Sequence, residues 1–164
     1  MKLRRFIKKN IMYILLVMLF FILSRIFTIN LATGSSMEPS ILSPSILFVN
    51  RLDRKFDRFD IIVCRQNGKT ITKRIIGLPG ESITVTEDGS IIIDHVLLED
   101  PYGNTTFPMY LEGNRSYPVV LAEDEYFVMG DNRNISEDSR HEDIGNIKEG
   151  HIIGKVMNNR VEGE

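Results

Sequence analysis

Two residues in separate segments have the side chains that a peptide-hydrolysing dyad needs. Ser36 lies in the segment Gly-Ser-Ser-Met-Glu-Pro-Ser at 34–40, and Lys73 lies within the apolar run Ile71–Ile76. A serine hydroxyl is a weak nucleophile until a neighbouring base removes its proton. A lysine amine can be that base when burial lowers its pKa, because desolvation disfavours the ammonium form. Ser36 and Lys73 are therefore candidates for nucleophile and general base.

The surroundings of Lys73 fit this interpretation without requiring it. Alternation along a strand would put Ile71, Lys73 and Ile75 on one face, so the lysine would share an apolar surface. A lysine that guards an edge strand against aggregation would produce the same local pattern. Taken alone, the run therefore leaves both roles open.

Other catalytic chemistries find less support. The chain has three histidines, His95, His141 and His151. A Ser-His-Asp triad through His141 is conceivable, but that residue is flanked by charges in a loop-like segment, and the other two lie on strand patterns. Cys64, the only cysteine, sits in the apolar run 61–64 and is interpreted as a small buried side chain. We expect neither a metal site nor a cofactor.

Three segments occur in a fixed order along the chain. Segment 34–40 is followed by Lys-Arg-Ile-Ile-Gly-Leu-Pro-Gly-Glu at 73–81 and by Gly-Asp-Asn-Arg-Asn-Ile-Ser-Glu-Asp-Ser-Arg at 130–140. This order resembles the type I signal peptidases, and the resemblance extends from the apolar N-terminal run to about Arg140. It implies a β-rich extracytoplasmic catalytic domain with a Ser–Lys dyad beside the membrane. It also implies removal of signal peptides from exported preproteins after small residues at −1 and −3. The short body with one anchor is similar to the Gram-positive form.

The resemblance assigns a role to each matching residue. Ser36 matches the nucleophile and its backbone N–H an oxyanion donor, while Lys73 matches the base that later returns the proton to the leaving amine. Ser136 matches the serine that hydrogen-bonds and orients the lysine, and Met37 is expected to help form the substrate pocket. Structural support of the site is expected from the charged residues Arg74, Asp131, Asp138 and Arg140.

Gly34 departs from the best-known pattern. Some members of the family carry a hydroxyl residue two positions before the nucleophile, where it donates a second hydrogen bond to the oxyanion. Here that position is Gly34. We expect backbone N–H groups or a bound water to fill the oxyanion role, with Gly34 kept for backbone freedom or for close approach of the substrate.

The elements that position these residues begin with an N-terminal apolar run. Residues 11–23 are apolar without a break, and 11–29, interrupted by Ser24 and Arg25, would span roughly 28 Å as a helix. This predicts a basic tip at 1–10, a single transmembrane helix at 11–29 and a catalytic domain at 30–164. A cleavable signal peptide, with Ala32-Thr33-Gly34 near its cleavage site, and a core helix are the alternatives.

Charge predicts the orientation. Five cations lie in the first ten residues, whereas the chain from residue 26 onward has 14 Lys and Arg against 22 Asp and Glu. Basic flanks stay in the cytoplasm, so we expect a single-pass protein of the cell membrane with its catalytic domain outside. The acidic body argues against binding to nucleic acid. The expected partners are signal peptides of preproteins, the lipid bilayer and the secretion translocon.

The body has the pattern of a mainly β fold. Short runs rich in Ile, Val, Phe and Tyr are separated by turn dipeptides, of which Asn67-Gly68 and Asp88-Gly89 predict hairpins. No stretch of helical period appears after the anchor. The predicted strands are 46–49, 59–65, 70–76, 82–86, 90–98, 117–121, 125–129 and 151–157.

Three other functions remain to be distinguished. The self-cleaving domain of SOS-response repressors shares a Ser-Met-x-Pro segment and a lysine strand, but it lacks the anchor and the third segment. A catalytically inactive pilus-assembly factor of the same fold would have lost Ser36 or Lys73, and both are present. A dedicated pilin-processing peptidase would have the same motifs as a general signal peptidase.

Overall fold

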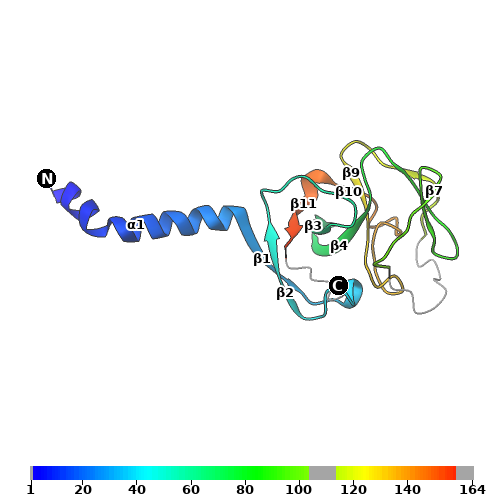
Figure 1. Ribbon diagram of the computed structural model, residues 1–164, viewed down its shortest axis with the longest axis horizontal. Helices are drawn as coiled ribbons and strands as arrows, with labels where there is room; N and C mark the ends of the chain where they lie inside the picture. The colour runs from blue at the N-terminus through cyan, green and yellow to red at the C-terminus, as the bar shows by residue number, and fades with distance from the viewer. Residues whose placement is uncertain (1, 104–113, 158–164) are drawn as a thin grey trace.

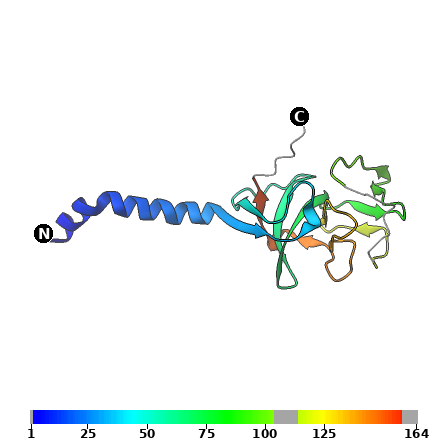
Figure 2. The same cartoon turned by 90° about the horizontal axis from the view of Figure 1, so that it is seen from below.

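A long N-terminal helix projects from a β-rich body. The computed structural model describes residues 2–103 and 114–157. Helix α1 (Lys2–Ile26) extends away from the body (Figures 1 and 2). Its stretch Lys9–Ile26 is long and apolar enough to cross a membrane, and none of that stretch is buried. At 1.5 Å per residue these 18 residues span about 27 Å, close to the thickness of a bilayer hydrocarbon core.

The helix ends three residues before the predicted limit of the anchor. Residues Phe27–Ala32 form strand β1, which pairs along its whole length with β2 (Ser45–Asn50). Exposed and half-buried side chains alternate along β1, with Phe27, Ile29 and Leu31 on the exposed side. This period of two favours a strand over a helix. The prediction that residues 27–29 continue the transmembrane helix is therefore wrong.

Two antiparallel sheets make up the body. The larger has the strand order β1-β2-β11-β3-β4-β9-β10, and the smaller has the order β7-β6-β5-β8. Two short 3₁₀ helices, η1 (Ser35–Met37) and η2 (Glu149–His151), interrupt the strands. The described part of the chain is thus mainly β after α1, as predicted. Besides β1 and β2, the strands are β3 (Ile61–Gln66), β4 (Lys69–Gly77), β5 (Ser82–Val85), β6 (Ile91–Ile93), β7 (Val96–Leu97), β8 (Val119–Val120), β9 (Glu125–Met129), β10 (Ile147–Lys148) and β11 (Ile152–Val156).

The predicted hairpins are confirmed, and one predicted strand is corrected. Asn67 and Gly68 join β3 to β4 with φ of 50° and 75°, and Asp88-Gly89 joins β5 to β6. The predicted strand 90–98 is instead a hairpin. Asp94 and His95 both have positive φ, which makes a two-residue turn and places Ile93 opposite Val96.

A hydrophobic cluster fixes the chain that follows β1. Met37, in η1, is only 2% exposed and packs in this cluster, whose other buried members are Ile41, Leu47, Val49, Ile61, Val63 and Val156. These residues come from β2, β3 and β11 and from the loop after η1. Burial of Met37 therefore holds η1 against the larger sheet, beside β4.

Candidate active site

The two predicted catalytic side chains meet at the junction of η1 and β4. The Lys73 amine donates a hydrogen bond of 2.9 Å to Ser36 Oγ, although 37 residues separate the two in the sequence. Ser36 lines the cleft described below, and the next residue, Met37, packs in the hydrophobic cluster that holds η1 in place. A hydroxyl and an amine at this distance have the geometry of a nucleophile and its base.

The environment of Lys73 favours the neutral amine. Lys73 is 4% exposed, and this burial lowers its pKa below the ordinary value for lysine. The negative charge of Asp138 and the thiol of Cys64 act in the opposite direction, while the positive charge of Arg140 lowers the pKa further. Burial outweighs the attraction of Asp138, so the amine loses its proton at a lower pH than an exposed lysine would.

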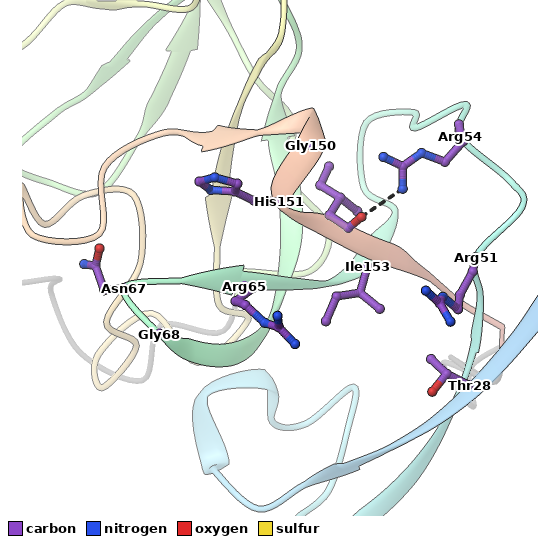
Figure 3. Close-up of a pocket in the computed structure, with 10 residues that line it drawn as sticks. Thr28, Arg51, Arg54, Arg65, Asn67, Gly68, Gly150, His151 and Ile153 are labelled. Carbon is purple, nitrogen blue, oxygen red and sulfur yellow. Dashed lines mark hydrogen bonds between the residues drawn. The ribbon is translucent and has the colours of Figure 1, made fainter. Parts of the chain in front are cut away.

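A cleft of about 270 Å³ opens beside the dyad. One wall is formed by residues 30–34, which are the end of β1 and the loop after it, and the other by residues 70–73 of β4. β1 is the end strand of its sheet, and β9 pairs with β4 only from Arg74 onward. Within the described residues both walls therefore have a strand edge without a partner. A larger cavity (Figure 3), nearer α1, contains neither Ser36 nor Lys73.

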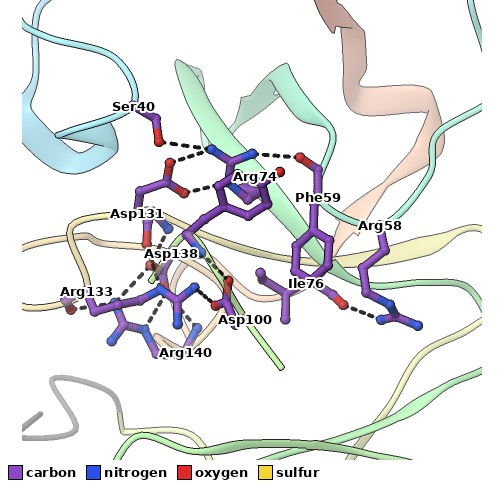
Figure 4. A network of polar contacts seen from close by, with 12 residues as sticks. Ser40, Arg58, Phe59, Arg74, Ile76, Asp100, Asp131, Arg133, Asp138 and Arg140 are labelled. Carbon is purple, nitrogen blue, oxygen red and sulfur yellow. Dashed lines mark hydrogen bonds and ion pairs between the residues drawn. The ribbon is translucent and has the colours of Figure 1, made fainter. Parts of the chain in front are cut away.

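A buried arginine supports the strand on which the lysine lies (Figure 4). Arg74 donates to both carboxylate oxygens of Asp131, at 2.7 and 2.6 Å, and the two side chains are almost fully buried. It also donates to the Phe59 carbonyl and to Ser40 Oγ, and it lies 3.7 Å from the centre of the Tyr102 ring. Because Ser40 follows η1, this network ties the segment of the nucleophile to β4 and to the turn after β9.

A second buried ion pair braces the loop 130–140. Arg140 donates to both carboxylate oxygens of Asp138, at 2.8 and 2.9 Å, and the Gly130 N–H donates to the same carboxylate at 2.9 Å. Burial alone would raise the pKa of Asp138, but the hydrogen bonds and the charge of Arg140 lower it overall. Asp138 is therefore an anion whose oxygens are occupied by structural donors, which suits a bracing role rather than proton transfer.

Comparisons with known proteins identify the family of the chain. The family model described as signal peptidase, peptidase S26, matches residues 3–159. The chain belongs to this family. It is 35% identical over 144 residues to signal peptidase I of Bacillus caldolyticus, covering 80% of this chain and 78% of the relative. It is 34% identical over 167 residues to signal peptidase I U of Bacillus subtilis strain 168, covering 90% and 86%.

A solved structure extends the similarity to the fold. The crystal structure of a signal peptidase I from Enterococcus faecalis V583 superimposes with a TM-score of 0.50 and 34% identity, covering 63% of this chain and 97% of that one. The chain is thus a serine peptidase with the mainly β fold of the signal peptidase family.

Gly130 has no predicted role beyond its place in the third segment, yet the segment of the nucleophile and the loop 130–140 approach each other most closely at this residue. A Cβ at this position would lie 2.6 Å from the Ser136 Cβ and closer still to Ser136 Oγ and the Ser36 carbonyl oxygen. That carbonyl also accepts a hydrogen bond of 3.0 Å from the Asn132 N–H. Only glycine lets the third segment approach the nucleophile this closely.

Ser136 lies at the site without the hydrogen bond that was expected of it. Its side chain is buried, but its hydroxyl has no hydrogen-bond partner within residues 2–103 and 114–157, Lys73 included. It is near enough to Asp138 to help stabilise that anion. The amine of Lys73 bonds to Ser36 instead. A buried hydroxyl left unpaired costs about 1–3 kcal/mol, so its presence requires a reason.

Gly34 lines the cleft in an ordinary extended conformation. Its φ is −107° and its ψ 152°, and a Cβ added there would meet no atom within 4 Å. Any residue adopts this conformation, so the backbone here gives no support to the expectation that Gly34 is kept for backbone freedom. Close approach of a bound substrate stays a prediction for this position.

Proposed function

We propose that this enzyme is a membrane-anchored endopeptidase that removes signal peptides from exported preproteins by a Ser36–Lys73 dyad. The observation that carries the proposal is the 2.9 Å hydrogen bond between the Lys73 amine and Ser36 Oγ at the wall of a cleft with two free strand edges. Membership of the signal peptidase family, and relatives named signal peptidase I, support this substrate class.

In the proposed reaction the neutral amine of Lys73 takes the proton of Ser36 as Oγ attacks the carbonyl carbon of the −1 residue. Collapse of the tetrahedral intermediate breaks the peptide bond, and the Lys73 ammonium donates its proton to the leaving amine. Water then hydrolyses the Ser36 ester with Lys73 again acting as base. The oxyanion accepts from the backbone N–H of Ser36, since N–H groups at the start of a helical turn have no intrahelical acceptor.

Ser136 has a defined place in this scheme. Its unpaired hydroxyl lies next to Gly130, near both Ser36 and Asp138. When Lys73 becomes an ammonium it has three N–H donors and no lone pair, so it needs further acceptors, and the Ser136 hydroxyl is then an acceptor that holds the ammonium in line. Catalytic hydrogen bonds are often absent from the free enzyme and form in the substrate complex.

The cleft accounts for the preference for small residues. An extended peptide can add as a strand between the edges of β1 and β4, which is a common mode of peptide recognition. Residues −1 and −3 of such a peptide point to the same side, because side chains alternate along a strand. The cleft is only about 270 Å³ and is narrowed by Ala32, Met37 and Ile71, so it fits small side chains at both positions.

The anchor places the dyad where signal peptides leave the bilayer. We propose that α1 crosses the cell membrane with its basic N-terminus in the cytoplasm, so that the body is extracytoplasmic. Only β1 and a short loop separate the end of α1 from Ser36. A preprotein whose apolar signal segment lies in the same bilayer, as delivered by the translocon, would present its cleavage site near the cleft.

One experiment tests the function. The purified full-length enzyme is incubated with one preprotein, and the products are analysed by mass spectrometry. We expect a single cut with small residues at positions −1 and −3, and no cut with Ser36→Ala. An intact preprotein with the unaltered enzyme would refute a general signal peptidase and would leave the dedicated pilin-processing peptidase and the inactive assembly factor as the alternatives.

A further inference from the structure

A second cavity, of about 810 Å³, opens where α1 joins the body (Figure 3). The backbone N–H of Arg51 donates to the carbonyl of Ile26, the last residue of α1, at 2.8 Å. The cavity therefore lies beside the end of the helix, and it shares no lining residue with the catalytic cleft. Its chemistry is set by Thr28, Arg51, Arg54, Arg65, His151 and Ile153, and no carboxylate is among the described residues that line it.

The three arginines of this cavity have no carboxylate partner within the described parts of the chain. Other arginines of the body, such as Arg74 and Arg140, are in ion pairs. Arg54 instead donates to two backbone carbonyls, those of Ile152 at 2.8 Å and Glu149 at 3.1 Å, which orient its guanidinium. In Figure 3 Arg51 and Arg65 lie on either side of Ile153. Unneutralised guanidinium groups around one cavity, in an otherwise acidic body, make a site for an anion.

We propose that this cavity binds the phosphodiester headgroup of an anionic phospholipid on the extracytoplasmic side of the bilayer. The inference rests on the proposed membrane anchoring by α1. Guanidinium groups match phosphate oxygens in pairs of parallel hydrogen bonds, which an ammonium cannot do. Arg51 and Arg65 supply such groups on two sides of the cavity, while the carbonyl-bound Arg54 adds a fixed third charge.

Depth in the membrane favours a lipid over an acidic peptide. Thr28 lies two residues beyond the end of α1, and two residues of strand advance about 7 Å. A headgroup layer is about 5–7 Å thick on each side of the hydrocarbon core. The cavity therefore lies at headgroup depth when α1 spans the core. The side chains of Phe27 and Ile29 are exposed on the face of β1 opposite Thr28.

Binding at this place has a consequence for the enzyme. α1 alone fixes the body at one point and leaves it free to rotate about the helix axis. A lipid held by Arg51 and Arg65 adds a second contact with the bilayer and restricts that rotation. The orientation of the catalytic cleft relative to the membrane surface is then defined.

The test measures lipid binding by the full-length protein. The protein is placed in nanodiscs of phosphatidylcholine with an increasing mole fraction of phosphatidylglycerol, and the lipids retained after release are counted by native mass spectrometry. We expect the unaltered protein to retain phosphatidylglycerol in preference. Arg51→Gln and Arg65→Gln should each weaken that preference about fivefold, and the double variant about 25-fold, at the contribution typical of one basic residue near a membrane surface. Arg54 is left intact because its carbonyl contacts also support η2.

Matched controls separate a site from general charge. Lys55→Gln/Lys148→Gln removes the same two charges at exposed positions that do not line the cavity, and it should retain the preference. An equal loss in this control, or an unchanged preference in Arg51→Gln/Arg65→Gln, overturns the proposal. So does tighter binding of soluble glycerol phosphate, inorganic phosphate or an acidic peptide than of phosphatidylglycerol in a bilayer.

Failure of the anchor can be recognised separately. Flotation with vesicles of phosphatidylcholine alone reports membrane insertion of α1 and does not depend on the arginines. A protein that does not float refutes the anchoring part of the proposed function. A protein that floats but shows no preference for phosphatidylglycerol refutes the lipid site alone.

Discussion

Gly130→Ala should disable the enzyme by displacing the nucleophile. The new Cβ would lie 2.6 Å from the Ser136 Cβ and nearer still to the Ser36 carbonyl oxygen, where ordinary contacts begin near 3.4 Å. The neighbours would have to retreat by about 1 Å, and a misplacement of that size costs about 10²-fold in rate. The Ser36 carbonyl accepts a hydrogen bond from the Asn132 N–H, which a retreat of the carbonyl would stretch. Because carbonyl and hydroxyl belong to the same residue, that retreat would also displace Ser36 Oγ from the Lys73 amine.

The assay for this prediction is kcat/KM on one signal-peptide substrate. Gly150→Ala is the matched control, because a Cβ at that position meets no atom within 4 Å, and it should keep the wild-type rate. Thermal unfolding of both variants shows whether the loss is local or results from unfolding. A folded Gly130→Ala enzyme with kcat/KM within about threefold of the wild type, far from the expected 10²-fold, would refute the reasoning.

Three further outcomes are expected. Because burial lowers the pKa of Lys73 and the neutral amine is the base, kcat/KM should rise with pH through that lowered pKa and then level off; a fall over that range would contradict it. Ser136→Ala should lower kcat by about 10–10³-fold, and unchanged kcat would mean that Ser136 does not position the lysine. Gly34→Ser should change kcat/KM by less than about tenfold, whereas a hundredfold gain would show an incomplete oxyanion hole.

The strands and hairpins were predictable where local chemistry dominates. Asn67-Gly68 adopts the left-handed turn that this dipeptide favours, and the strand ends that flank it lie within a residue of their predicted positions. The turn at Asp94-His95 lacks glycine and so carries no such signal. β10 is two residues long and exists only because it pairs with β9. β1 was obscured because its apolar positions continue the composition of the anchor.

The residues of the site could be predicted from the sequence, but the contacts between them could not. Resemblance to the family brought Ser36 and Lys73 to attention, yet their hydrogen bond depends on burial of Met37 and on pairing of distant strands. The close approach of Gly130 to Ser36 and Ser136 depends on the tertiary structure, and no local sequence pattern predicts it. The partner of Arg74, Asp131, is likewise fixed only when β4 and β9 pair.

Lys73→Arg tests the central claim most directly. The substitution keeps a hydrogen-bond donor near Ser36, but a guanidinium is not deprotonated in proteins and cannot serve as a base. Cleavage of one preprotein by this variant is followed in single turnover beside the wild-type enzyme, with Ser36→Ala as the background. The account predicts a rate indistinguishable from that of Ser36→Ala. Near-normal cleavage by Lys73→Arg would show that Lys73 is not the general base.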